Sequence, residues 1–420
     1  MIRRLHMMLA AAALITSCLT IATRASDAAW LDSPYLYRYF FWGIPTQLDR
    51  SNQYKWFPSR LVQNGAYKFQ FTPGPSEAVP AVVEYEEGDK MKRAALGELL
   101  QSTETHSFIV ARDDKVLYEN YFNGYERNSL NESWSMAKSF VSALIGIAIG
   151  ERSIKSIDDP ITDYLPELKA QQGFDAITIR NLLTMGSGIQ YRFGLFPWDE
   201  FVLAGFYPDL RQLLLSDIKI VEPPGKTFHY NNYNTELLGM ILERATHRTL
   251  SEYLQEKIWQ PLGMEYSAQW SLDHQPDGLE LSATLLNARA IDFAKFGRLF
   301  LNDGNWNGRQ IVPQTWAVES TIKDPQDDRD WETFGRWRNF GGYYKYFWWG
   351  VSLGRDDYEF LANGTYGQFI FISPRTRVVI VRTAGEDGID PPYWREVFHS
   401  IAEHVDQSAA LKQGASTIRQ

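Results

Sequence analysis

One stretch of sequence, Ser135-Met-Ala-Lys138-Ser-Phe-Val-Ser-Ala-Leu-Ile-Gly-Ile-Ala-Ile149, decides the fold of this chain. Its apolar residues leave no polar face, so we predict a helix that is buried all round. Ser135 and Lys138 stand at its start, three positions apart, and therefore share one helix face. The helix N-terminus stabilises an alkoxide and favours loss of the lysine proton. A buried hydroxyl beside a buried amine indicates an activated serine nucleophile.

The Ser-x-x-Lys pattern alone is weak, because it occurs three times in the chain. The copy at 216–219 runs into an extended approach to the turn at 223–225, where the two side chains would point to opposite faces. The copy at 320–323 precedes Asp-Pro-Gln-Asp-Asp, which is typical of a solvated helix end. Only the first copy has a buried helix behind it. The alternative for Lys138 is an amine that snorkels from that helix without catalysing anything.

The composition excludes some classes of function. The chain has 420 residues, of which 44% are hydrophobic, enough for one large domain or two smaller ones. A net charge of −9 argues against nucleic acid and against a polybasic membrane contact. The 14 Trp residues indicate a large core and pocket walls, and the alternative is a surface on which sugars stack.

The first 25 residues have the character of an export signal, with Arg3 and Arg4 before a short apolar stretch at 7–15. Two cleavage sites compete. Ile15-Thr-Ser-Cys18 resembles a bacterial lipoprotein box, which would end the signal at residue 17 and lipidate Cys18, whereas Thr23-Arg-Ala25 is an ordinary signal-peptidase site. We expect a periplasmic protein, either free or anchored to the membrane through Cys18. Because Cys18 is the only cysteine, no internal disulfide is expected.

Two β-hairpins are predicted near opposite ends of the chain, at 107–122 and 369–383. Between them, from about 154 to 319, helical periodicity dominates. We therefore expect an α+β fold, in which one antiparallel sheet is built from both chain ends and flanked by helices, with a mostly helical lobe inserted. The expected segments are a signal peptide (1–25), an irregular N-terminal extension (26–90), a main domain (91–405) and a polar tail (406–420), with helices near 94–101, 179–185, 235–246, 251–258, 288–301 and 393–405.

A third chemical group is offered by Tyr230 in Tyr230-Asn-Asn232. It follows the turn at 223–225 and precedes a helix whose start Asn232 or Asn234 could cap. A turn-to-helix junction can project a phenol into a cleft, where it could pass a proton to a leaving group. The alternative is a capping loop with a structural tyrosine.

Taken in order, these motifs resemble the serine β-lactamase and penicillin-binding-protein superfamily. The resemblance is closest to class C β-lactamase-related hydrolases, such as family VIII esterases and 6-aminohexanoate-dimer hydrolase. It covers about residues 95–405 and implies the β-lactamase/transpeptidase-like fold. The motifs that carry it are Ser135-x-x-Lys138, Thr178-Ile-Arg-Asn-Leu-Leu-Thr-Met-Gly-Ser-Gly188, Tyr230-x-Asn232, Leu237-Leu-Gly239, Asp292-Phe-Ala-Lys-Phe-Gly-Arg-Leu299 and Asn305-Trp-Asn-Gly308.

The resemblance implies a role for each matched residue. Ser135 would be the acylated nucleophile and Lys138 its base. Tyr230 would exchange protons with the leaving group and with the deacylating water. Asn232 would orient the lysine and the substrate carbonyl, and the backbone N–H groups of Ser135 and Gln368 would form the oxyanion hole.

The family's third motif, Lys or His followed by x-Gly, corresponds to Thr365-Tyr-Gly367. Gly367 would let the substrate approach the strand. Thr365 cannot supply the cation that in β-lactamases and carboxypeptidases helps to bind a substrate carboxylate, and a nearby arginine such as Arg382 is the candidate to replace it. This departure leaves acyl transfer intact and argues against β-lactam or D-Ala-D-Ala substrates.

Other chemistries find little support. The chain has no Gly-x-Ser-x-Gly elbow, His-Glu-x-x-His, phosphate loop or dinucleotide fingerprint, so we expect no metal and no cofactor. His229 would line the cleft or simply pack. The sequence therefore predicts an exported serine hydrolase that cleaves a small-molecule ester or amide through an acyl-enzyme on Ser135. The alternatives are a β-lactamase or D-Ala-processing peptidase and, in another class, a non-catalytic cell-wall or peptide-binding relative.

Overall fold

The computed structural model describes residues 52–417, apart from 89, 195, 197 and 356. The signal peptide, Cys18 and the first part of the expected extension lie outside the described residues, so cleavage and lipidation stay predictions. Within the described part, no helix combines the length and the hydropathy that a bilayer span requires.

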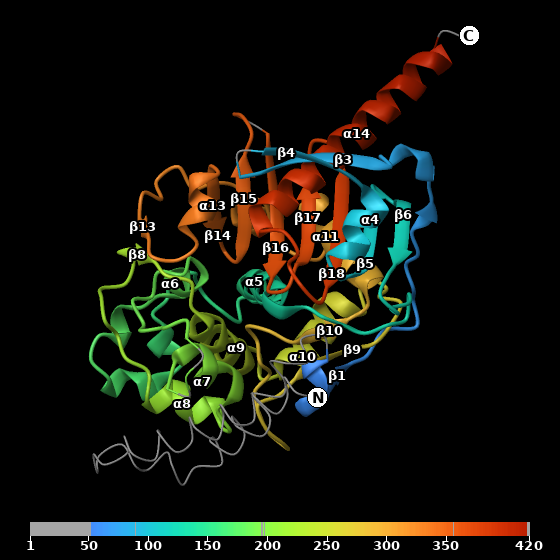
Figure 1. Ribbon diagram of the computed structural model, residues 1–420. Helices are drawn as coiled ribbons and strands as arrows, with labels where there is room; N and C mark the ends of the chain where they lie inside the picture. The colour runs from blue at the N-terminus through green and yellow to red at the C-terminus, as the bar shows by residue number, and fades with distance from the viewer. Residues whose placement is uncertain (1–51, 89, 195, 197, 356, 418–420) are drawn as a thin grey trace, which may run out of the picture.

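An eight-stranded sheet forms the centre of the molecule, in the order β14-β15-β16-β17-β18-β5-β6-β2 (Figure 1). The β5–β6 hairpin, from the first third of the chain, joins the later strands through the antiparallel pair β5–β18. All strand pairs of the eight-stranded sheet are antiparallel except β6 with the short β2, which is parallel. The predicted sheet built from both chain ends is therefore confirmed. Its strands are β2 (Thr72–Pro73), β5 (Thr105–Arg112), β6 (Lys115–Tyr121), β14 (Gly342–Lys345), β15 (Trp348–Ser352), β16 (Tyr358–Gly364), β17 (Gln368–Ser373) and β18 (Val378–Ala384).

Helices cover both faces of this sheet (Figure 1). Helices α4 (Leu96–Ser102) and α14 (Pro391–Thr417) lie on one face, and α11 (Ala290–Leu301) lies on the other. Gly297 of α11 lies so close to Val379 and Ile370 that a Cβ at this position would overlap both side chains. The close contact between α11 and the sheet therefore depends on glycine.

Helix α5 (Ala137–Gly150) is the buried helix that the sequence predicts. Every residue from Ala137 to Ala148 is buried, and the ring of Phe140 stacks on that of Phe296 from α11 at a centroid distance of 3.6 Å. Helix α5 therefore joins the sheet half of the molecule to the helical half, which in Figure 1 lies below the sheet.

The inserted region contains the expected helices and, in addition, a small sheet. Four short strands pair in the order β1-β9-β10-β7, and β1 (Ser59–Val62) comes from the N-terminal extension. Periodicity did not reveal these strands because they are only two to four residues long. The other strands of this sheet are β7 (Asn131–Glu132), β9 (Ala268–Ser271) and β10 (Leu286–Ala288), and the helices are α6 (Ile179–Leu183), α7 (Glu200–Phe206), α8 (Leu210–Ser216), α9 (Asn232–Thr246), α10 (Leu250–Leu254) and α12 (Gln314–Thr321).

Two predictions about the ends of the domain are wrong in part. The described portion of the extension is not irregular, because it supplies β1, β2 and β3 (Val82–Glu87), the last of which pairs with β4 (Lys90–Ala95) at the start of the main domain. The expected polar tail continues α14 as helix to Thr417. Its polar residues include several good helix formers and no proline, so nothing stops the helix at residue 405.

Candidate active site

Ser135 lies in a single turn of 3₁₀-helix, η5 (Trp134–Met136), directly before α5. The preceding residue, Trp134, has a φ of 45°, in the left-handed region that a non-glycine residue adopts only at a cost. Across the turn, Gly364 at the end of β16 lies against the carbonyl oxygen of Ser133, and a Cβ there would overlap it. The strained turn and the end of β16 together fix the place of the Ser135 hydroxyl.

Lys138 is the second residue of α5, one turn after Ser135, and is only 1% exposed. Its Nζ donates to Ser135 Oγ at 2.9 Å and to the carbonyl oxygen of Ala283, also at 2.9 Å. Burial lowers the pKa of this amine to about 7, and the carboxyl of Glu236 opposes that shift. A neutral amine next to the serine hydroxyl can accept its proton. The sequence placed these two groups together correctly.

Tyr230 completes a three-residue cluster. Its ring is buried and lies 4.9 Å from Lys138 Nζ, and its hydroxyl makes a hydrogen bond with Ser135. Burial raises the pKa of this phenol above its ordinary value, whereas the bond to Ser135 lowers it. Its backbone N–H donates to Thr333 Oγ1 at 2.9 Å. The structure thus brings together the three groups that the sequence singled out from separate segments.

Asn232 is the first residue of α9, but it does not cap the helix. The cap is Asn231, whose Oδ1 accepts from the backbone N–H of Tyr233 at 2.9 Å, so the expectation that Asn232 or Asn234 caps the helix is wrong. Asn232 Oδ1 is buried and has no hydrogen-bond partner within the described part of the chain. A carbonyl oxygen held ready for a donor is consistent with an orienting role.

The third motif forms the turn between β16 and β17. Thr365 is exposed there and carries no charge. Gly367 has a φ of 77°, and a Cβ on it would overlap the guanidinium of Arg382. The backbone conformation and Arg382 behind it therefore both require glycine here. That Gly367 also lets the substrate approach the strand stays a prediction. The side chain of Gln368 binds the turn to β18, with Nε2 donating to the Ala384 carbonyl at 2.6 Å.

Arg382 is not available to a substrate. It is fully buried, its guanidinium lies 4.0 Å from the ring centroid of Trp394, and all three of its nitrogens donate to protein oxygens. The expectation that Arg382 replaces the missing cation is therefore wrong, because a planar donor fork with its bonds already made cannot turn to a substrate carboxylate. Its acceptors are Gly367 O (2.9 Å), Thr103 O (2.7 Å), Glu386 O (3.2 Å) and Thr105 Oγ1 (3.0 Å).

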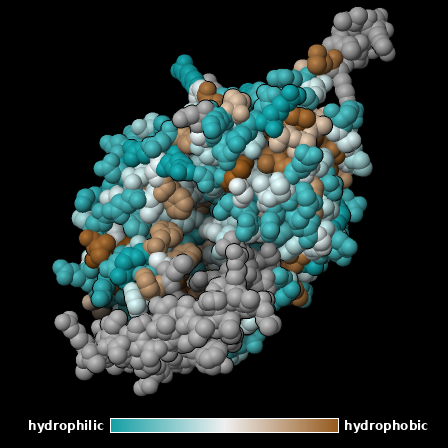
Figure 2. Space-filling model, viewed as in Figure 1, coloured by the Kyte–Doolittle hydropathy of each residue, from teal (hydrophilic) through white to brown (hydrophobic). Residues whose placement is uncertain are grey.

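Aromatic side chains surround Tyr230. The short parallel pair of β8 (Thr227–Phe228) with β13 (Asp330–Trp331) brings Phe334 alongside, at 5.1 Å between ring centroids. Phe193 lies 6.3 Å from the same ring, and each of these phenylalanines is 47% exposed. Figure 2 shows a hollow in the middle of this face, at the position of α5 in Figure 1. The remaining neighbours of the Tyr230 ring are Tyr344 and Trp349.

Glu236, Ala283 and the two exposed phenylalanines were not predicted from the sequence. Glu236 could have been identified from the sequence, because it stands next to the apolar run 237–242 of a predicted helix. An acid buried there is costly unless it has hydrogen-bond partners, so it marks a candidate functional residue. Ala283 gave none, since it acts through its backbone carbonyl. His229 pairs with Glu332, which favours neither of the two interpretations offered for it.

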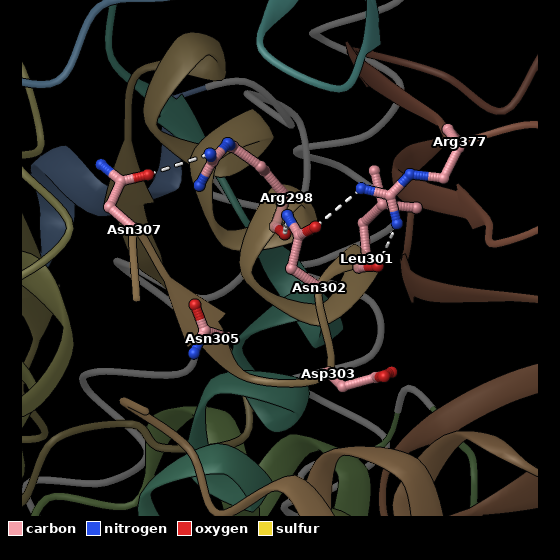
Figure 3. A pocket seen from close by; sticks show the side chains of 7 residues that line it. All are labelled: Arg298, Leu301, Asn302, Asp303, Asn305, Asn307 and Arg377. Atoms are coloured by element: carbon pink, nitrogen blue, oxygen red, sulfur yellow. Dashed lines mark hydrogen bonds between the residues drawn. The ribbon is translucent and has the colours of Figure 1, made fainter. Parts of the chain in front are cut away.

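A separate cavity of about 400 Å³ lies at the other end of the β17–β18 hairpin from the turn at 365–367 (Figure 3). Arg377 there donates to the carbonyl of Leu301 and to Asn302 Oδ1, so its charge is held by the protein. None of the candidate site residues reaches it. The cavity is lined by Arg298, Leu301, Asn302, Asp303, Asn305, Asn307 and Arg377.

The fold and the Ser135–Lys138–Tyr230 cluster define a serine hydrolase of the β-lactamase and penicillin-binding-protein type, and the comparisons with known proteins agree. The family model for beta-lactamase matches residues 93–392, so this chain belongs to the beta-lactamase family. The resemblance stated from the motifs is confirmed.

Individual proteins and solved structures show which members of this family the chain resembles. The chain is 27% identical to the 6-aminohexanoate-dimer hydrolase of Paenarthrobacter ureafaciens over 326 residues, which are 75% of this chain and 81% of that protein. A solved structure from Bacillus anthracis, assigned as a 6-aminohexanoate-dimer hydrolase, superposes with a TM-score of 0.72 at 25% identity and covers 92% of this chain and 98% of its own. A class C beta-lactamase mutant shares the fold with a TM-score of 0.53 at 17% identity, covering 74% of this chain and 95% of its own.

Proposed function

We propose that this protein is an exported hydrolase that cleaves an uncharged, apolar ester or amide through an acyl-enzyme on Ser135. The observation that carries the proposal is the bond of 2.9 Å from Lys138 Nζ to Ser135 Oγ, made by an amine that is almost wholly buried. A lysine kept from water loses its proton readily and becomes a base at neutral pH.

The reaction proceeds in two halves. Ser135 Oγ attacks the carbonyl carbon while its proton passes to Lys138 Nζ. Tyr230, bonded to Ser135, delivers a proton to the leaving oxygen or nitrogen, which departs as an alcohol or amine, and the phenol takes back a proton from the Lys138 ammonium. Water then attacks the acyl ester, gives its proton back through the same groups and releases a carboxylic acid.

Developing negative charge on the carbonyl oxygen needs donors. In our proposal these are the backbone N–H groups of Ser135 and Gln368, supported by the close approach of Gly364, the register partner of Gln368, to the turn that carries Ser135. Asn232, with its buried and unpartnered Oδ1, would orient Lys138 and the substrate.

The substrate class follows from what borders Tyr230. On the proposed mechanism the leaving group lies on the side of this phenol, where Phe193 and Phe334 are half exposed and offer apolar area. Thr365 carries no charge and Arg382 is buried, so the third motif offers a substrate carboxylate no cation. The site therefore favours an apolar leaving group over the carboxylate of a β-lactam or a D-Ala peptide.

The test has two parts. A fluorophosphonate probe should label the wild-type protein and not Ser135→Ala, and only the wild type should hydrolyse p-nitrophenyl esters. Labelling at another residue, or unchanged turnover by Ser135→Ala, would reject the assignment. A non-catalytic cell-wall or peptide-binding relative would take no label at all.

Substrate choice is tested with paired esters. Phe334→Ala should lower kcat/KM about tenfold for acetates of large apolar alcohols and leave ethyl acetate nearly unchanged, since a buried ring contributes about 1–3 kcal/mol. Phe196→Ala is the matched control, because Phe196 is similarly exposed, at 51% against 47% for Phe334, and stacks on Trp198 instead. Rapid hydrolysis of nitrocefin, with little ester turnover, would instead favour the β-lactamase or D-Ala-processing alternative.

A further inference from the structure

Glu236 is a carboxyl buried beside the proposed active site. It lies on α9 and is only 2% exposed. Its Oε1 accepts from the backbone N–H of Ala283 at 3.0 Å, and its Oε2 accepts from the backbone N–H and the hydroxyl of Ser282 at 2.9 and 2.7 Å. Burying a carboxyl costs several kcal/mol, which its three hydrogen bonds only offset. Glu236 is therefore a candidate for a role in the reaction.

The segment that Glu236 holds is the segment that holds Lys138. The carbonyl oxygen of Ala283 accepts from Lys138 Nζ at 2.9 Å, so one residue separates the amine from the carboxyl. Gly239, one turn further along α9, leaves the space that Ser282 occupies, since a Cβ there would approach its side chain to 2.9 Å. The Leu-Leu-Gly motif therefore serves to bring residues 282–283 against α9.

We propose that Glu236 is a positioning residue for the reaction, which fixes the Ala283 carbonyl that holds Lys138 and sets through its charge how firmly that amine keeps its proton. This rests on the proposed function of Lys138 as the base. Glu236 touches neither substrate nor reacting atoms in this scheme, and acts through Ala283 and through its field.

The electrostatics support the geometry. Burial raises the pKa of Glu236 to about 7 and lowers that of Lys138 to about 7, and each group opposes the shift of the other. When the carboxyl is ionised the amine keeps its proton to a higher pH, and when it is neutral the amine releases the proton sooner. The other titratable groups that face this pair are the phenols of Tyr191, which is affected by Glu236, and Tyr230, which lies by Lys138.

Glu236→Gln separates positioning from mere stability. It removes the charge and keeps the shape, so the acid limb of kcat/KM for a p-nitrophenyl ester should move down by about one pH unit, the effect of one charge at this separation in a protein interior. A fall in kcat larger than the change in KM should accompany it, because the amide of Gln cannot accept from both N–H groups. A folded variant whose limb stays in place, or moves up, overturns the proposal.

The matched control is Glu359→Gln, which removes a carboxyl that is also buried but binds Arg395 and His399, away from Lys138. It should lower the melting temperature and leave the limb where it is.

Ser282→Ala serves if Glu236→Gln does not fold. It removes one donor that favours the ionised carboxyl, so the limb should still move down, by less than in Glu236→Gln. An unchanged limb in Ser282→Ala would count against the proposal, whereas retained turnover in Ser135→Ala would count against the proposed function itself.

Discussion

The burial of the Lys138 amine predicts at which pH the activity falls as the solution is made more acidic. The pKa of Lys138 falls from 10.5 to about 7 because burial disfavours its charged form. At pH 7 a lysine of ordinary pKa is neutral in about 3 molecules in 10,000, whereas one with a pKa near 7 is neutral in about half of them. The site thus has roughly 1,500 times more base at this pH than an exposed lysine would offer.

We expect kcat/KM for a neutral ester to be flat above pH 8 and to fall about tenfold per unit below pH 6.5, since this constant reports the free enzyme. Lys138→Arg keeps the positive charge but cannot lose a proton, so its activity should be lower by about a factor of 1,000 or more at every pH and show no limb near 7. The assay is p-nitrophenyl acetate hydrolysis from pH 5 to 10 with constant ionic strength. A wild-type limb above pH 9, or a Lys138→Arg variant within tenfold of wild type, would refute the reasoning.

Three further substitutions test other parts of the structure. Gly364→Ala places a methyl group on the carbonyl of Ser133, so it should lower kcat at least a hundredfold while the melting temperature changes by only a few degrees; normal kcat would show that the turn can shift freely. Arg382→Met leaves several buried oxygens without their donor and should lower the free energy of unfolding by about 3 kcal/mol or more in urea titrations, whereas a stable variant with a raised KM for carboxylate-bearing esters would return Arg382 to the substrate. Lys138→Met should raise the free energy of unfolding by up to about 5 kcal/mol below pH 7, measured in the same urea titrations. Between pH 7 and 10.5 the unfolded wild-type chain binds a proton at Lys138 that the folded protein does not, so wild-type stability rises with pH across that window. A Lys138→Met protein that gains as much at pH 10.5 as at pH 6 would contradict this sign.

Local sequence determined a good deal of this protein. The run 137–148 has no polar face, and a helix of that kind is stable only when it is enclosed, so its burial could be predicted. The Ser135–Lys138 contact also follows from the sequence, because residues three apart on one helix face meet whatever surrounds them. The hairpins 105–121 and 368–384 are local as well, and their pairing into one sheet follows once both must bury two faces.

The tertiary structure alone decided what completes the site. Tyr230 reaches Ser135, and Ala283 reaches Lys138, across 95 and 145 residues of sequence, and a backbone carbonyl leaves no trace in residue identity. The hydrogen bonds of Arg382 were also not visible in the sequence, where this arginine was a candidate to bind substrate. Nor did the sequence show that Gly367 lacks a Cβ where the Arg382 guanidinium lies. Sequence periodicity reports which face of an element is buried, whereas the partner that a buried group meets depends on how distant elements come together, which is why Glu236 became meaningful only in three dimensions.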